Sequence, residues 1–225
     1  MTNRNVPLVP ALSGIVAIVL PFVAQALSGG GGGSPDLPAS RAKIETWLAS
    51  QSVTPAHVAG GVVELIGILM LIVFAATLWS VLRSADSEDG IASATAFGAG
   101  LVAAAIKLAS FPAAFAAIWR HDQGINPQLA AALVDMNNVS FVLMWTLFAV
   151  MIAAAATVIF RSGVLPRWLG WFGSVTAAIS IVSAPAAAQV PPLGVMLAFI
   201  WIVATSVVLT RRALKREPAV VAVAA

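Results

Sequence analysis

The sequence contains no cysteine and very little charge. Without cysteine the chain forms no disulfide, carries no thiol nucleophile and holds no cysteine-ligated zinc or iron–sulfur centre. Lys, Arg, Asp and Glu make up only 9% of its 225 residues, far below the share in a soluble domain. We therefore expect a chain that spends most of its length away from water.

Motifs that carry chemistry are absent as well. The sequence has no His-Glu-x-x-His, no Gly-x-Ser-x-Gly elbow and no Walker loop. Its two histidines, His57 and His121, show no metal-ligand spacing, although they and Asp122 are candidates to meet outside the membrane. We predict no catalytic residue, no cofactor site and no metal site, and hence a protein that is not an enzyme.

Apolar residues, in contrast, are abundant. They make up 60% of the chain, and the mean hydropathy is +0.97. A helical crossing needs about 20 apolar residues, so the length accommodates six crossings with short links. We predict an all-α polytopic membrane bundle forming one domain over residues 1–225. The crossings are predicted at residues 7–27, 62–82, 91–119, 129–160, 168–190 and 193–210.

The first crossing has an alternative interpretation. Ala24-Gln25-Ala26 has the small-x-small form of a signal-peptide cleavage site, which would leave five crossings. The apolar run from Val6 to Leu27 is, however, longer than the hydrophobic region of a signal peptide.

Residues 28–56 are predicted to form an extracytoplasmic loop. It begins with a flexible tether of five glycines, Gly29 to Gly33. Ser40 then caps a short helix that places Ile44, Trp47 and Leu48 on one side. We predict that this helix lies on the membrane surface or over the mouth of the bundle.

Three predicted crossings each carry one charge: Glu64, Lys107 and Asp135. Residues three, four or seven positions away are small in each case, such as Gly60 and Gly67 around Glu64. Small residues on a helix face let another helix approach closely. We therefore predict that all three charges face neighbouring helices and not lipid.

Depth can be compared by counting from the inner helix ends at about 1.5 Å per residue. Glu64 precedes Arg83 by nineteen residues, and Lys107 follows Gly90 by seventeen. The two charges should differ in depth by only about 3 Å, which predicts an ion pair. Asp135 lies about 10 Å further out and is predicted at the outer mouth.

Three functional classes are compatible with this polar set, completed by Asn137 and Asn138. The first is a structural or partner-binding membrane protein in which the charges specify helix pairing. The second is a transporter of an ion or small solute that uses Glu64, Lys107 and Asp135, because ionisable residues inside a membrane are candidate functional groups. An intramembrane enzyme is a remote third. The sequence favours the first, because no matching polar set continues to the inner face. A cavity reaching Lys107 would favour the second.

Basic residues predict the orientation. If both ends are inside, eight of them are cytoplasmic and three are outside. The positive-inside rule thus predicts a multi-pass cell-membrane protein with both termini in the cytoplasm. The basic tail, defined as Arg211, Arg212, Lys215 and Arg216, is also a candidate site for anionic lipid. Four positive charges beside a membrane are too few to predict a nucleic-acid partner. The cytoplasmic set is Arg4, Arg83, Arg161, Arg167, Arg211, Arg212, Lys215 and Arg216, and the outer set is Arg41, Lys43 and Arg120.

The link between the fourth and fifth crossings reads Arg-Ser-Gly-Val-Leu-Pro-Arg-Trp-Leu-Gly from Arg161 to Gly170. Together with the spacing of the crossings, it resembles a family of bacterial integral-membrane proteins of about this length, known only as a domain of unknown function. The glycine run and the Ala-rich third crossing have no counterpart in that resemblance. It implies a six-helix bacterial membrane protein and assigns no activity to any residue.

Overall fold

The computed structural model describes residues 7–28, 35, 39–51, 53–121, 123–184 and 193–215, in which helices are the only regular elements. They are α1 (Leu8–Leu27), α2 (Arg41–Ala49), α3 (Pro55–Arg83), α4 (Ile91–His121), α5 (Pro127–Ser162), α6 (Arg167–Ser183) and α7 (Leu193–Leu214). The predicted glycine tether lies outside the described residues.

Five helices, α1, α3, α4, α5 and α7, are long and apolar enough to cross a membrane. The predicted class, a helical membrane bundle, is therefore confirmed. The described part of α6 has 17 residues, slightly fewer than the roughly 20 that a crossing needs. The sixth crossing thus stays a prediction.

Helix α3 begins seven residues before its predicted crossing, at Pro55. Thr54 Oγ1 accepts a hydrogen bond from the His57 backbone N–H at 3.2 Å, and a proline suits the first helical turn. These local signals start the helix before its apolar segment begins. The same combination, Asn126 followed by proline, starts α5, and Asn126 Oδ1 accepts from the backbone N–H of Gln128 at 2.8 Å.

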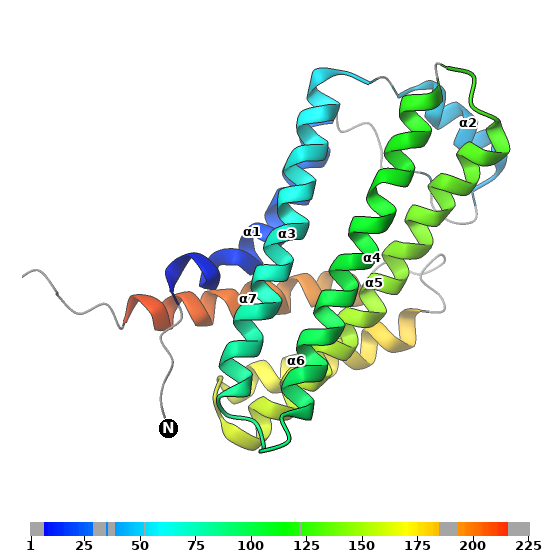
Figure 1. Cartoon of the computed structure of the whole chain (residues 1–225). Helices are drawn as coiled ribbons and strands as arrows, with labels where there is room; N and C mark the ends of the chain where they lie inside the picture. Colours follow the sequence, from blue (N-terminus) through cyan, green and yellow to red (C-terminus); the bar gives the residue numbers. More distant parts are fainter. Residues whose placement is uncertain are drawn as a thin grey trace, which may run out of the picture.

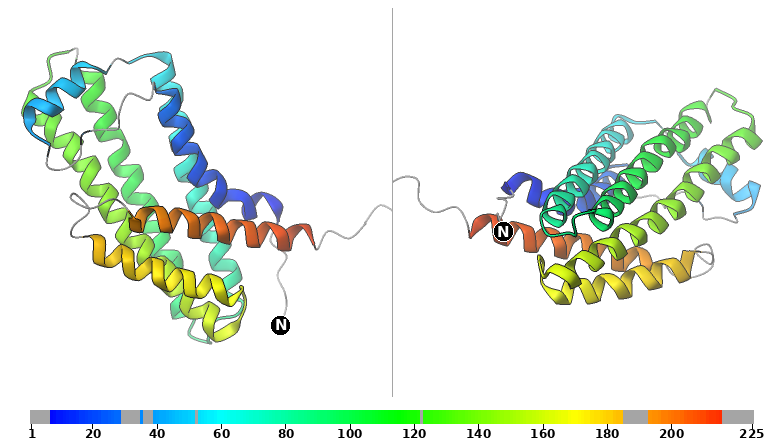
Figure 2. Two further views of the ribbon diagram at one scale, coloured as in Figure 1. Left: turned by 180° about the vertical axis from the view of Figure 1, so that it is seen from behind. Right: turned by 60° about the horizontal axis from the view of Figure 1, so that its bottom comes forward.

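The long helices form two closely packed pairs, α1 with α3 and α4 with α5. The pairs approach each other through α3 and α4 at the lower end in Figure 1 and diverge toward the upper end. Helices α6 and α7 run across the lower half of this array, α6 against α5 and α7 against α1 and α6 (Figures 1 and 2).

Side-chain size explains the divergence. In the lower half of α4, a Cβ on Gly100 would lie 3.1 Å from Ala75 Cβ of α3 and 2.9 Å from Met151 Sδ of α5, so the glycine lets α3 and the Met151 side chain pack directly on α4. Higher on α4, the large side chains Phe111 and Phe115 replace these small residues. The face carrying Gly100 was predicted to contact other helices, and it is buried.

A second close crossing joins α1, α3 and α7. A Cβ on Gly14 of α1 would lie within 2.6 Å of Phe74 Cδ2 and closer still to Ser206 Oγ, and both of these residues are fully buried. By contrast, a Cβ on Gly98 of α4 would meet nothing within 4 Å.

Helices α6 and α7 are joined by a hydrogen bond as well as by packing. The indole Nε1 of Trp201 donates to the backbone carbonyl of Leu169 at 3.0 Å, and Trp201 is fully buried. The ring fits against Gly173, where a Cβ would lie 2.7 Å from Trp201 Nε1.

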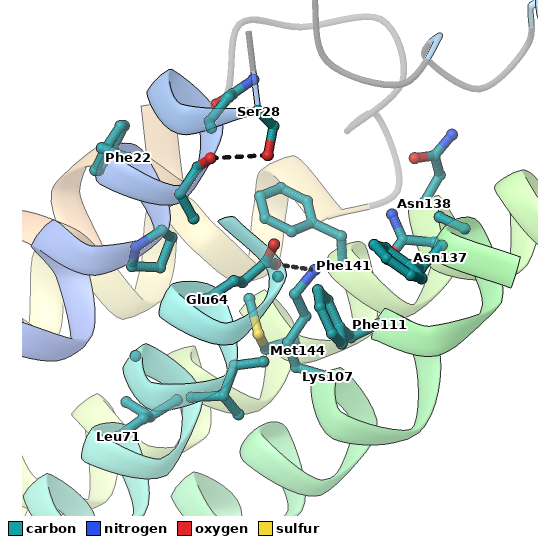
Figure 3. A pocket seen from close by; sticks show the side chains of 18 of the residues that line it. Phe22, Ser28, Glu64, Leu71, Lys107, Phe111, Asn137, Asn138, Phe141 and Met144 are labelled. Atoms are coloured by element: carbon teal, nitrogen blue, oxygen red, sulfur yellow. Dashed lines mark hydrogen bonds and ion pairs between the residues drawn. The ribbon is translucent and has the colours of Figure 1, made fainter. Parts of the chain in front are cut away.

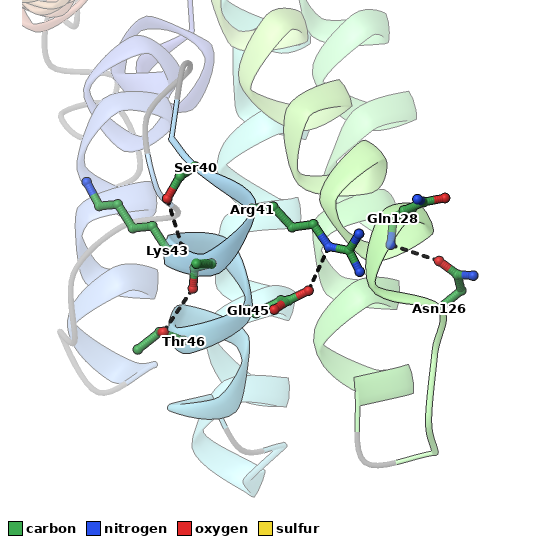
Figure 4. Close-up of polar contacts among 8 residues, drawn as sticks. Ser40, Arg41, Lys43, Glu45, Thr46, Asn126 and Gln128 are labelled. Carbon is green, nitrogen blue, oxygen red and sulfur yellow. Dashed lines mark hydrogen bonds and ion pairs between the residues drawn. The ribbon is translucent and has the colours of Figure 1, made fainter.

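The predicted helix after Ser40 is present as α2. Ser40 Oγ caps it by accepting from the backbone N–H of Lys43, and Arg41 pairs with Glu45 on its exposed side (Figure 4). Ile44 and Leu48 are buried against α4 and α5 near the upper end of the array. This placement agrees with a helix over the mouth of the bundle.

The turn between α3 and α4 is held by its acidic residues. Asp86 Oδ2 accepts from the backbone N–H of Ser93 at 2.8 Å, at the positive end of α4. Burial acts to raise the pKa of Asp86, but hydrogen bonds from Ser93 and Ser87 together hold that pKa below its ordinary value. Asp89 accepts from Ser87 Oγ and from the backbone N–H of Ile91, and these bonds lower its pKa too.

Candidate functional site

A cavity of about 560 Å³ lies between the two helix pairs. Its walls come from α1, α3, α4 and α5, with Trp47 of α2 at one end and Phe199 of α7 at the other. Along α3 it extends from His57 to Leu71, about 21 Å at 1.5 Å per residue. Ligand-binding pockets in proteins have volumes of about 300–1,000 Å³, so this cavity is large enough for a small organic molecule.

Glu64 and Lys107 lie opposite each other in this cavity and form an ion pair, with Lys107 Nζ 3.1 Å from Glu64 Oε1 (Figure 3). The structure thus places together the two charges whose depths match. The Glu64 side chain keeps 26% of its surface exposed and that of Lys107 17%, so the pair is accessible from the cavity and not sealed in a closed core.

The small residues around Glu64 contact a neighbouring helix, as predicted, and that helix is α1. A Cβ on Gly60 would lie 2.8 Å from the Ala24 carbonyl oxygen, and one on Gly67 would lie 3.1 Å from Pro21 Cδ. This close contact fixes α3 against α1 and leaves Glu64, between the two glycines, at the edge that faces α4.

Amide side chains lie near the upper end of the cavity. Asn137 and Asn138 of α5 line it together with Gln51, which follows α2 (Figure 3). Asn138 Nδ2 donates to the backbone carbonyl of Pro35 at 2.8 Å and so connects Pro35 to α5. His57 also lines this end, and its Nδ1 lies 3.1 Å from Thr54 Oγ1.

The lower end of the cavity is aromatic. Trp145 packs edge-on against Phe199 with ring centroids 4.7 Å apart, and against Phe148 at 5.1 Å. Its indole Nε1 is buried and has no hydrogen-bond partner within the described part of the chain. Most buried N–H groups have an acceptor, so this donor is an exception.

Two aromatic rings flank the ion pair itself. Phe111 of α4 and Phe141 of α5 lie beside Lys107 in Figure 3, and Met144 lies below them. The polar pair is therefore set in an apolar wall. Such a cavity suits a ligand with a small polar group and a bulky apolar body.

Asp135 departs from its predicted place. It is half-buried, does not line the cavity and makes no ion pair within the described residues. Ala132, on the face predicted to contact another helix, is exposed. The buried face of α5 at this height carries Ala130 and Val134, which pack against α2 and α4 and turn Asp135 away from the cavity.

Among the basic residues of the tail, Arg212 is engaged in the fold. It donates a hydrogen bond to the Val164 carbonyl in the link between α5 and α6. Arg211 and Lys215 lie in the last described turns of the chain, and Arg216 lies outside the described residues. Within the described residues no group of three His, Asp or Glu side chains is placed to hold a metal ion, and Asp122 lies outside them.

Sequence reasoning missed most of the cavity wall. It assigned no role to Trp145, Phe148 or Phe199, because an aromatic residue in a crossing has the same signature whether it faces lipid, a neighbour or a cavity. Gln25 on α1 is a usable signal, since a side-chain amide in an apolar crossing needs a polar environment.

The family model described as "Domain of unknown function (DUF4386)" matches residues 15–211, which include most of α1, all of α2 to α6, and α7 as far as Arg211. No curated protein and no solved structure matches the chain.

Proposed function

The chain belongs to the DUF4386 family, an uncharacterised family of unknown function, and on that premise we propose that it binds a small organic solute in the cavity between its helix pairs. The observation that supports this most directly is the cavity at Lys107. A protein that used Glu64 and Lys107 only to pair helices would enclose them. Here both charges line a space large enough for a ligand.

The arrangement fits one half of a transport cycle. Below the cavity, α3, α4 and α5 meet at Gly100, where Ala75 and the Met151 side chain leave little space between the helices. The cavity therefore ends inside the molecule, as in a transporter that is open to one side. Asp135 has no part in this proposal, because it lies outside the cavity.

We propose that the cavity faces outward. The links at the lower end carry Arg83, Arg161 and Arg167, and Arg161 is close enough to Asp89 to lower its pKa. By the positive-inside rule this end is cytoplasmic, so the upper end with α2 is external. This is the orientation with both termini inside, in the cell membrane.

The structural or partner-binding role is the second candidate. One observation favours it: the ion pair bridges α3 and α4, the helices through which the two pairs meet. We propose in both cases a role without catalysis. Anionic lipid at Arg211 and Lys215 is compatible with either function.

Because the chain has no cysteine, single cysteines introduced by mutation can report which positions a thiol reagent reaches. Ala114 lines the cavity, whereas Ala116 lies two residues further along α4 on its exposed surface. Single cysteines at these two positions differ in depth by only about 3 Å. The protein is placed in lipid nanodiscs, where a charged maleimide reaches both membrane faces, and the labelling rate is measured.

We expect Ala114→Cys to react and Ala116→Cys to remain largely unlabelled, because the thiolate that reacts forms in water and not in lipid. Equal resistance of both thiols would refute an accessible cavity and favour the structural role. Labelling of Ser50→Cys, but not Ser87→Cys, in intact cells would support the orientation, and the reverse would overturn it.

A further inference from the structure

Among the described residues that line the cavity, Glu64 and Lys107 provide one charge of each sign, and His57 is the only other ionisable side chain. A ligand with a single charge would attract one member of the pair and leave the other without its partner. Charges in an apolar environment are strongly destabilised when unpaired. The charge pattern of the cavity therefore disfavours simple anions and simple cations.

We infer that the ligand is a zwitterion with a bulky apolar body. Its anionic group contacts Lys107 and its cationic group contacts Glu64, so that four charges alternate and none is left alone. Both side chains remain partly exposed to the cavity, which allows this contact without withdrawing either one from its helix. The inference rests on the proposed solute-binding function and specifies its ligand class.

The apolar body has a defined place. Below the ion pair, the cavity is lined by Met144, Trp145, Phe148 and Phe199. Aromatic side chains pack well against planar or bulky apolar groups in edge-on or offset geometry. The zwitterionic head then lies above, level with Glu64.

Two sources can supply such a molecule. One is a free solute, for example a hydrophobic amino acid, and the other is a lipid with a zwitterionic head group. They share the recognition chemistry at Glu64 and Lys107. A free solute has a compact apolar body, whereas a lipid has a long acyl chain. A probe of each kind therefore distinguishes the two sources.

The test uses a matched series with one indole body: L-tryptophan as the zwitterion, indole-3-propionate as the anion, tryptamine as the cation and tryptophol as the uncharged alcohol. Lysophosphatidylcholine represents the lipid. Each probe is added to the Ala114→Cys variant in nanodiscs, and its protection of the thiol from the maleimide is titrated. Ala116→Cys is the matched control.

We expect L-tryptophan or lysophosphatidylcholine to protect Ala114→Cys at a concentration at least about tenfold lower than any singly charged or uncharged indole, with no effect at Ala116→Cys. Protection by tryptophan identifies a free solute, and protection by lysophosphatidylcholine alone identifies a lipid. Equal or stronger protection by an anionic or cationic probe would overturn the zwitterion assignment.

Variants that remove one of the two charges should change which probe is preferred, and a purely structural role of the pair predicts no such change. With Lys107→Met only the carboxylate remains, so preference should shift to tryptamine. With Glu64→Gln it should shift to indole-3-propionate. The exchanged variant, Glu64→Lys with Lys107→Glu, retains both charges and should still prefer the zwitterion. Unchanged preference in the two single variants would refute the inference.

The two levels of the proposal fail differently. If Ala114→Cys reacts but no probe protects it, the cavity is accessible and the ligand class assigned here is wrong. If Ala114→Cys does not react at all, the solute-binding function itself fails, and the ligand class fails with it.

Discussion

Reversing one charge of the Glu64–Lys107 pair should destabilise the protein, and reversing both should restore it. Each charge sits 3.1 Å from its partner in an apolar wall. Two unit charges about 4 Å apart interact by about 4 kcal/mol at an effective dielectric constant of 20. A single reversal, Glu64→Lys or Lys107→Glu, replaces this attraction by a repulsion of similar size.

The net effect is smaller than that sum, because both side chains can move into the cavity. Breaking a buried pair typically costs about 3–5 kcal/mol, and this pair is partly exposed. We expect each single reversal to lower the free energy of unfolding by about 2–4 kcal/mol. For a chain of this length that corresponds to a fall in Tm of roughly 4–16 °C. The double reversal should lie within about 1 kcal/mol of the wild type.

Thermal unfolding in one detergent, followed by circular dichroism, measures all four proteins. Arg41 and Glu45 provide a control, because their pair is exposed and Glu45→Gln should cost less than about 1 kcal/mol. A double reversal as unstable as the worse single variant would show that the two side chains do not interact in the folded protein, and the cavity chemistry argued above would lose its basis.

Three further predictions test other parts of the structure. Gly14→Ala should lower Tm by several degrees, because its Cβ would overlap two fully buried side chains, whereas Gly98→Ala should be neutral or slightly stabilising since open space surrounds it; equal effects would contradict the helix crossing. Trp201→Phe should cost about 1–3 kcal/mol by leaving a buried carbonyl without its donor, while Trp145→Phe removes an unpartnered N–H and should cost less, as chemical unfolding of both would show. The lowered pKa of Asp86 means that its hydrogen bonds contribute stability above the unfolded-state pKa of about 3.9, and that this stability is lost as pH falls through the folded-state pKa. Asp86→Ala should therefore lower the free energy of unfolding by about 1 kcal/mol at pH 7 and show no such loss below pH 4, and an identical acid profile in both proteins would exclude this group.

Local signals in the sequence predicted the helices and the ion pair, for physical reasons that are specific. A hydrophobic run fixes a crossing, a capping residue fixes its start, and a constant rise per residue fixes depth. Glu64 and Lys107 could be paired from these quantities alone. The capped α2, with Ile44 and Leu48 buried, followed from the same rules.

The cavity could not be predicted in this way, because it depends on the angle between helix pairs. That angle follows from contacts between residues distant in sequence, such as Gly100 with Met151. Asp135 shows the same limitation. Its depth follows from counting residues along α5, but the direction of its side chain depends on how α2 packs on α5 through Val134. The course of α7 across the array is likewise set by tertiary contacts.

Removing both charges separates the two functional classes. Replacing a fully buried ion pair with apolar side chains is often neutral or stabilising by about 1–4 kcal/mol, because no charge must then be withdrawn from water. The Glu64–Lys107 pair is only partly buried, so the effect should have the same sign and a smaller size. We therefore expect Glu64→Leu with Lys107→Met to fold with at least wild-type stability and to insert more readily, since the Ala-rich α4 no longer carries a charge that costs about 3 kcal/mol. If the pair served only to hold the helices together, apolar packing would replace it and this variant would remain functional in the cell. If the pair binds a solute, the variant is stable, keeps an accessible Ala114→Cys thiol and loses protection by every zwitterionic probe. A stable double variant that still binds a zwitterion would refute the role assigned here to Glu64 and Lys107, because the described part of the chain provides no other oppositely charged pair in the cavity wall.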